Sequence, residues 1–207
     1  MSEWWTYRLS DFLMFSPRIY WRLVEQYNRD VWPAQLLGLV VGITAMKLAT
    51  LRQARADRAL AALLAASWLW VGWAFHWQRY ATINWSAQYI AMAFALQAAL
   101  LVGVAATAQP TARRAGGERH ARSAPRRVAG WLAVGGGLLY PFFGAIAGRP
   151  WTQAEVFAIA PEPTALATLG LLALAGPAYS SAARRVLAVI PSVSLVLGAA
   201  TLWVMSD

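Results

Sequence analysis

The sequence predicts an all-α integral membrane protein with about six transmembrane helices and an N-terminal interfacial amphipathic helix. Charge-free segments occupy 59–78, 80–112, 128–148, 163–183 and 186–206. A sixth, 31–46, extends to Leu51 if Lys47 reaches the interface with its amine. These lengths suit the roughly 20 apolar residues that a spanning helix needs. Only 13% of the 207 residues are charged, against about 25% in average soluble domains.

We expect spans near 31–51, 59–77, 85–108, 128–147, 164–183 and 186–205. The chain is thereby divided into an interfacial segment, 1–30, and one transmembrane domain, 31–207, which contains a basic linker at 109–127. Little length remains for a soluble catalytic domain, and no nucleophile–base pair or phosphate loop is visible. The sequence has no cysteine, which excludes thiolate metal sites. We therefore expect neither an enzyme nor a bound cofactor or metal.

The distribution of basic residues predicts the orientation. Of 18 Lys and Arg residues, twelve lie in the first, third and fifth connections between spans, and six lie on the other side. The positive-inside rule places the first group in the cytoplasm and both termini on the periplasmic side of a bacterial inner membrane. The net charge of +9 is thus interpreted as a topology signal and not as a nucleic-acid interface. The expected partner of this surface is the lipid bilayer.

Residues 1–30 contain a second type of helix. Ser16 and Pro17 form a typical helix start, with a side-chain cap followed by proline. Apolar residues then recur at helical spacing, and charged residues occupy the opposite face, with Glu25 and Arg29 forming an i,i+4 pair. This pattern predicts a helix on the outer leaflet. A helix that docks on a partner protein is the alternative.

Prolines and glycines predict irregularities in the second half of the chain. Pro141, Pro177 and Pro191 lie within the last three spans, where we expect kinks. A short amphipathic or re-entrant helix is expected near 152–159, between proline-marked boundaries. Two small-residue motifs predict close helix approach: Gly38 with Gly42, and Gly144 with Gly148.

Polar and aromatic residues gather at the predicted outer side. Such a set can line a groove for an amphiphile, a quinone-like headgroup or a cation. The alternative is interfacial anchoring and loop packing, with His76 as an ordinary hydrogen-bonded residue. The candidate ligand-binding residues are Tyr27, Asn28, Trp32, Gln35, His76, Trp77, Arg79, Asn84, Tyr140, Glu155 and Glu162.

Several stretches resemble an uncharacterised bacterial family of small multi-span membrane proteins, a domain-of-unknown-function family whose members are often labelled as permeases. The likeness covers most of residues 20–175. In that family a cysteine often stands where this chain has Glu162, so no thiol-based role carries over. The resemblance implies a membrane fold and no established activity. The matching stretches are Tyr27-Asn28, Val31-Trp32-Pro33-Ala34-Gln35, His76-Trp77, Ile83-Asn84, Tyr140-Pro141, Gly144, Gly148 and Pro161 to Thr164.

Two functions are compatible with these features. The first is a protein that binds or passes a small solute or amphiphile at the outer aromatic and polar site. It would act without ion coupling, because the predicted span centres hold no Asp, Glu, Lys or Arg. The second is a non-catalytic accessory subunit of a larger membrane complex. A homo-oligomer is compatible with either function.

The predicted orientation can be tested with reporter fusions. A reporter fused at Ala115, in the basic linker, should report a cytoplasmic location, and one fused after Asp207 an external location. Activity of paired alkaline phosphatase and fluorescent-protein fusions measures this. An external reading at Ala115 would contradict the predicted orientation.

Overall fold

A computed structural model of the chain describes residues 14–51, 53–107, 124–174 and 179–206. Within these ranges the structure is helical and contains no strand. The α-helices are α1 (Pro17–Asp30), α2 (Ala34–Thr50), α3 (Ala54–Trp70), α4 (Ala87–Thr107), α5 (Ala124–Leu138), α6 (Tyr140–Ile146), α7 (Pro161–Leu174) and α8 (Ser181–Ser206). A π-helix, η3 (Val71–Trp77), continues α3, and two 3-10 turns follow as η4 (Tyr80–Thr82) and η5 (Trp151–Gln153).

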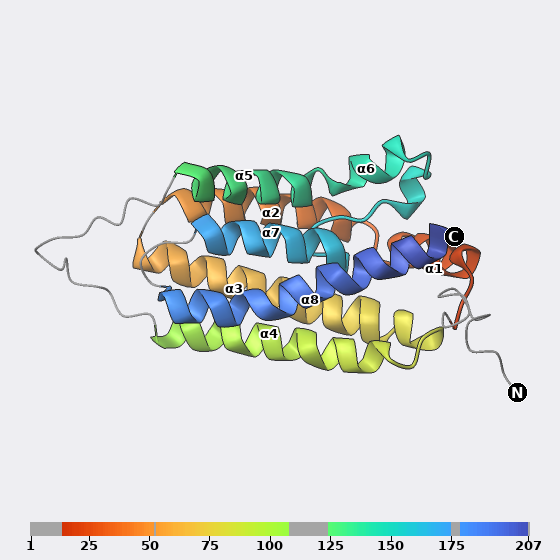
Figure 1. The fold of residues 1–207 in the computed structure, drawn as a ribbon, viewed down its shortest axis with the longest axis horizontal. Coiled ribbons are helices and arrows are strands. Elements are labelled where there is room, and N and C mark those ends of the chain that lie inside the picture. Colours follow the sequence, from red (N-terminus) through yellow and green to blue (C-terminus); the bar gives the residue numbers. More distant parts are fainter. Residues whose placement is uncertain (1–13, 52, 108–123, 175–178, 207) are drawn as a thin grey trace, which may run out of the picture.

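The long helices run side by side along one axis, with α5, α7 and α8 lying in front of α2 and α3, and α4 packed against α3 at one edge, in the view of Figure 1. We call one end of the bundle the basic end, where α2 and α4 finish and α3, α5 and α8 begin. It carries Lys47, Arg55, Arg58, Arg126, Arg127, Arg184 and Arg185. The opposite, aromatic end carries α1, η4, η5 and the connection 147–160.

Trp68 of α3 is fully buried in the middle of the bundle and contacts two other helices. Its ring lies 4.4 Å from that of Phe94 on α4, and its Nε1 donates a hydrogen bond to Thr168 Oγ1 on α7 at 3.0 Å. Gln97 likewise joins α4 to α8, because its Nε2 donates to the Leu187 carbonyl at 2.9 Å. Buried polar groups are thus used as links between helices.

Helices α5 and α7 approach most closely through glycine. A Cβ atom on Gly170 would lie 2.6 Å from the Gly130 carbonyl oxygen and 2.7 Å from the Val134 nitrogen. A Cβ on Gly137 would lie 2.8 Å from the Ala167 backbone nitrogen. The two backbones can therefore touch only because Gly130, Gly137 and Gly170 carry no side chain.

The prediction of an amphipathic helix after Ser16 is confirmed. The Ser16 side chain accepts a hydrogen bond from the Ile19 N–H, and Arg29 pairs with Glu25 at 3.0 Å. Helix α1 makes an angle of 85° with α2 and lies across the bundle. Its apolar face therefore packs on the aromatic end of this same chain. Neither lipid nor a partner protein is needed to bury this face, whose members are Tyr20, Leu23, Val24 and Tyr27.

The connection between α6 and α7 differs from the expected short helix at 152–159. The 3-10 turn Trp151–Gln153 is followed by extended backbone and a turn, and residues 155–160 are all buried. The prediction failed because a short stretch with helix-like apolar spacing was stabilised instead by contacts with distant helices.

In the two predicted glycine motifs, Gly42 lies against another helix, because a Cβ there would collide with the Leu138 side chain of α5, whereas the other three glycines do not. Gly38 faces the buried connection, and a Cβ there would lie 2.5 Å from the Phe157 carbonyl oxygen. A Cβ on Gly144 would lie 2.9 Å from the Arg149 guanidinium, and Gly148 turns the chain with φ of +81°. Glycine at these sites makes room for a loop and for an arginine side chain.

The described part of the chain contains three helical segments that are long and apolar enough to cross a membrane, or up to five if each bent helix pair counts as one span. The expected kink near Pro141 is present, because α5 and α6 meet at 62°. Pro191 lies within α8, and Pro177 lies outside the described residues. Helix α7 is described from Pro161 to Leu174, and Tyr179 and Ser180 are not helical, whereas the sequence predicted one span over 164–183.

Gly170→Val tests the close contact between α5 and α7. The added carbons would collide with the Gly130 and Val134 backbone, so we expect the free energy of unfolding in detergent to fall by about 1–3 kcal/mol. Tryptophan fluorescence during denaturant titration measures it. Gly135→Ala is the matched control, since a Cβ there meets no atom within 4 Å. Equal destabilisation by both substitutions would contradict this view of the interface.

Candidate functional site

The aromatic end contains a cavity of about 400 Å³, which we call the aromatic-end pocket. It lies between α1, η3, η4, the start of α4, the start of α7 and the last turns of α8. Its size falls within the range of small-molecule sites, about 300–1,000 Å³. Aromatic rings and polar groups share its wall, among them Tyr20, Phe75, His76, Tyr80, Glu162 and Thr201.

Glu162 supplies a buried carboxyl group to this pocket. It lies in the first turn of α7, ahead of the apolar stretch that begins at 164, and it is 8% exposed. Its Oε2 atom is buried without a hydrogen-bond partner among the described residues. Gly198 of α8 makes space for the carboxyl, since a side chain there would collide with it. A buried carboxyl oxygen without a donor is costly, so a ligand that supplies a donor to Oε2 would be stabilised here.

His76 supplies a second set of unused polar atoms. Both ring nitrogens are buried and lack hydrogen-bond partners within the described residues. Its ring packs against Phe94, with centroids 4.6 Å apart, and against Phe75 at 5.2 Å. The π-helix η3 places it there, and this helix type is frequent at functional sites. Gly72 allows this wider helix to contact α4, because a Cβ would lie 2.8 Å from the Phe94 Cβ.

A second buried carboxyl, Glu155, stands next to Glu162. Arg149 donates from Nη1 to Glu155 Oε2 at 3.0 Å, and its guanidinium carbon lies 4.1 Å from the Trp21 ring centroid. Burial raises the pKa of Glu155. Burial and the nearby Glu155 carboxylate raise the pKa of Glu162 to about 8. The positive charge of Arg149 is thus shared by two carboxyl groups. Near neutral pH the two carboxyl groups together retain one proton.

Helix α1 holds the buried connection in place. Tyr27 donates from its hydroxyl to the Ile159 carbonyl at 3.0 Å, and Asn28 donates from Nδ2 to the Ala154 carbonyl at 2.8 Å. Gln35 in turn donates from Nε2 to the Asn28 carbonyl at 2.7 Å. These three side chains are among the predicted binding residues, and in the structure each donates a hydrogen bond to a backbone carbonyl. They position the segment that carries Glu155.

Ala158 has an unfavourable backbone conformation within this connection. Its φ of +64° lies in the left-handed region, which is unfavourable for a residue with a Cβ. The Ala158 N–H donates to Thr164 Oγ1 at 2.9 Å, and Thr164 donates to the Ala160 carbonyl at 2.6 Å. Thr164 in the first turn of α7 therefore holds the preceding loop in place through these two hydrogen bonds. Glu162 lies in the same turn.

The predicted binding residues separate into distinct places. His76, Asn84 and Glu162 line the aromatic-end pocket. Asn28, Trp32 and Gln35 line a different groove of about 490 Å³, next to Trp151. The others have these positions: Tyr27 and Glu155 are buried beside the pocket, Tyr140 lies within electrostatic range of Glu155, Trp77 is 45% exposed, and Arg79 pairs with Asp30 at 2.7 Å.

Residues from distant segments complete the pocket and were not identified from the sequence. Tyr20 comes from α1, Tyr89 from α4, and Ser194 and Thr201 from α8. Ser194 and Thr201 stand seven residues apart, and Gly198 lies between them on the same face. This spacing of small and hydroxyl residues at two-turn intervals is the signal that could have indicated a polar face on α8.

Metal binding finds no support in the described residues. Within the ranges given above, no three His, Asp or Glu side chains come together in a way that could hold a metal ion. The two carboxyl groups, the imidazole and the tyrosine rings are instead suited to hydrogen bonds and to cation–π contacts with an organic ligand.

Comparison with known proteins identifies a family and no activity. A family model described as a family of unknown function (DUF6064) matches residues 17–205, which confirms the resemblance to an uncharacterised family. No curated protein matches the chain. No solved structure matches it either.

The raised pKa of Glu162 predicts a pH-dependent stability. The folded protein binds this proton more tightly than the unfolded chain, whose carboxyl pKa is about 4.3. The free energy of unfolding should therefore fall as pH rises from that value to about 8, and then level off. Thermal unfolding in detergent across this pH range measures the effect.

Glu162→Gln should flatten much of this pH dependence, because glutamine cannot ionise. Glu25→Gln is the matched control, since Glu25 pairs with Arg29 on the outer face of α1. The control should keep the wild-type slope. A slope that survives in Glu162→Gln would show that the buried carboxyl does not control it.

Proposed function

Since the chain belongs to the DUF6064 family, whose function is unknown, we propose its function from its own geometry. We propose that it is a multi-pass membrane protein that binds or passes a small solute or amphiphile with an ammonium headgroup. The site is the aromatic-end pocket. The observation that carries this proposal is that Glu162 lines the pocket and that its buried Oε2 has no hydrogen-bond partner in the described residues.

The wall of the pocket favours a cation that also has apolar surface. Tyr20, Phe75, Tyr80 and Tyr89 present rings to the cavity, and aromatic faces attract ammonium groups by about 0.5–2 kcal/mol each. The carboxyl of Glu162 supplies a charge-assisted hydrogen bond. An ammonium favours the ionised carboxyl, so its affinity should increase as pH rises through the pKa of Glu162.

Exposed apolar surface supports membrane insertion. In the most apolar 18-residue window of α8 only 17% of the residues are buried, and in that of α4 only 28%. Water-soluble monomers rarely expose contiguous apolar faces on this scale. We propose that lipid covers these faces and that six passes cross the membrane, with α2, α3–η3, α4, α5–α6, α7 from residue 164 onwards, and α8 as the spans.

The charge distribution supports the proposed orientation in a bacterial inner membrane. The basic end would face the cytoplasm, and the aromatic-end pocket would then open towards the periplasm. The six passes carry no Asp, Glu, Lys or Arg near their centres. Passage of the solute would therefore proceed without ion coupling. Proton flux in liposomes that tracks solute flux, and is lost in Glu162→Gln, would contradict this point.

One observation favours a second function, that of an accessory subunit. The groove of about 490 Å³ beside α1 is flanked by Trp32 and Trp151, which are 64% and 60% exposed. Exposed tryptophan is common at protein interfaces. Co-purification from native membranes discriminates between the functions, because a stoichiometric larger partner would support the subunit.

Binding of N,N-dimethylethanolamine, which is a protonated tertiary ammonium with one N–H donor, tests the proposed site. We expect the purified protein to bind it more tightly than 3-methyl-1-butanol, its uncharged carbon isostere, because only the ammonium can donate to Glu162. Glu162→Gln should weaken dimethylethanolamine binding by about 10- to 100-fold, the value of a hydrogen bond to a charged group. Isothermal titration calorimetry in detergent measures both affinities.

Trp77→Ala provides the matched control for this experiment. Trp77 is one residue from His76 but is 45% exposed and does not line the pocket. It should leave the affinity for dimethylethanolamine unchanged. Equal affinity for dimethylethanolamine and the neutral isostere, or equal loss in both variants, would contradict the proposal.

A further inference from the structure

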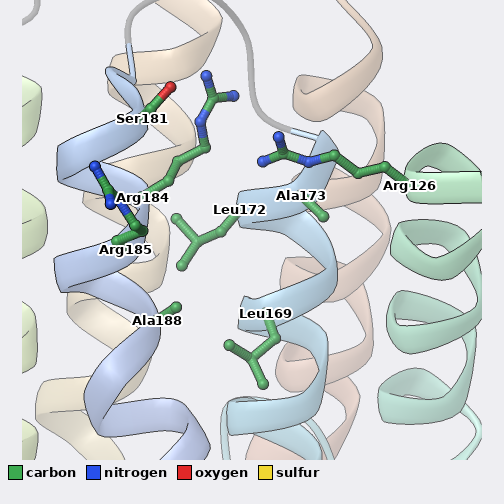
Figure 2. Close-up of a pocket in the computed structure, with 8 residues that line it drawn as sticks. All are labelled: Arg126, Leu169, Leu172, Ala173, Ser181, Arg184, Arg185 and Ala188. Atoms are coloured by element: carbon green, nitrogen blue, oxygen red, sulfur yellow. The ribbon is translucent and has the colours of Figure 1, made fainter. Parts of the chain in front are cut away.

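A second cavity, of about 390 Å³, lies at the basic end (Figure 2). Three arginines line it: Arg126 from the start of α5, and Arg184 and Arg185 from the first turns of α8. Figure 2 shows Arg126 reaching over the end of α7 towards Arg184. No carboxylate is among the described residues that line this cavity.

The balance of charge at this cavity favours an anion. Arg126 and Arg184 are close enough to repel each other electrostatically, and Asp57 at the start of α3 offsets part of this charge. Asp57 is buried and is 2% exposed, whereas Arg126 and Arg185 are exposed. A phosphate group between guanidinium groups would accept charge-assisted hydrogen bonds and remove the repulsion. The N-terminal dipole of α8 adds a smaller attraction.

Below the arginines the cavity becomes apolar. Leu169 and Leu172 of α7 point into the space between α7 and α8, and Ala188 of α8 lies opposite them (Figure 2). A free phosphate ion would gain nothing from this floor. An amphiphile would place its headgroup among the arginines and its acyl chain along the aliphatic side chains.

We propose that this cavity binds the headgroup of an anionic phospholipid. The ligand class is a phosphodiester with a net negative charge and acyl chains, such as phosphatidylglycerol. In the proposed orientation the basic end meets the leaflet where basic pockets between spans bind such headgroups. The site lies at the opposite end of the bundle from the aromatic-end pocket, so it is independent of the solute proposed there.

Native mass spectrometry of the full chain in detergent tests the site. We expect phosphatidylglycerol to remain bound when zwitterionic phosphatidylethanolamine of the same acyl chains is lost. Arg126→Gln and Arg185→Gln should each weaken phosphatidylglycerol binding by about 5- to 10-fold, since each removes one guanidinium contact. Both side chains are exposed, so their replacement leaves the core intact.

Arg127→Gln is the matched control, because Arg127 is exposed on the same helix but does not line the cavity. It should keep wild-type affinity. Inorganic phosphate, added in competition, should not displace the lipid. Equal binding of the two lipids, equal loss in Arg127→Gln and Arg126→Gln, or full displacement by inorganic phosphate would each overturn the proposal, the last by indicating a site for a soluble anion.

Discussion

Burial of the backbone at residues 154–160 is the constraint on which the arrangement of the aromatic end depends. A loop inside a helix bundle must satisfy its carbonyl and amide groups without water. Tyr27, Asn28 and Thr164 meet this requirement by bonding the carbonyls of Ile159 and Ala154 and the amide of Ala158. Gly38 provides the space, because any side chain there would meet the Phe157 carbonyl. Helix α1 and the first turn of α7 are thus parts of one support for the loop.

The same burial explains why two carboxyl groups lie at this end. Glu155 is on the supported loop, and Glu162 is on the turn that ends it. Arg149, held over Trp21 and in the space left by Gly144, neutralises only part of their charge. At the basic end positive charge is in excess, because the arginines outnumber the nearby carboxyl group of Asp57. The aromatic-end pocket and the cavity at the basic end therefore differ in charge, which is why we propose a cationic ligand for the first and an anionic ligand for the second.

Local patterns predicted the helices well. The Ser16–Pro17 start and the apolar spacing of α1 depend on neighbours within a few residues, so the sequence contains the whole signal. Charge-free segments indicated the long helices for the same reason. Their ends were less accurate, because α7 starts three residues before the expected span.

Contacts between distant residues could not be predicted. The role of Gly170 depends on Gly130 and Val134, forty and thirty-six residues earlier in the chain. In the 38–42 glycine pair, Gly42 packs on Leu138 of α5 as the helix-packing pattern predicts, but Gly38 makes room for a loop, and the spacing alone cannot distinguish these uses. Tyr27, Asn28 and Gln35 were predicted to bind a ligand for a similar reason. The sequence shows that a side chain can donate a hydrogen bond, but it does not show whether the acceptor is a solute or a backbone carbonyl.

The contact between Asn28 and Ala154 spans 126 residues of chain, and this has a consequence for biogenesis. Translation proceeds at roughly 5–20 residues per second, so α1 waits about 6–25 s after its own synthesis before the loop that it supports exists. During that interval its apolar face can meet Phe75 and Tyr80, which are made earlier than the loop, but its amide and hydroxyl donors lack their loop carbonyls. The first helix to be made therefore completes its contacts only after the loop between α6 and α7 has been synthesised.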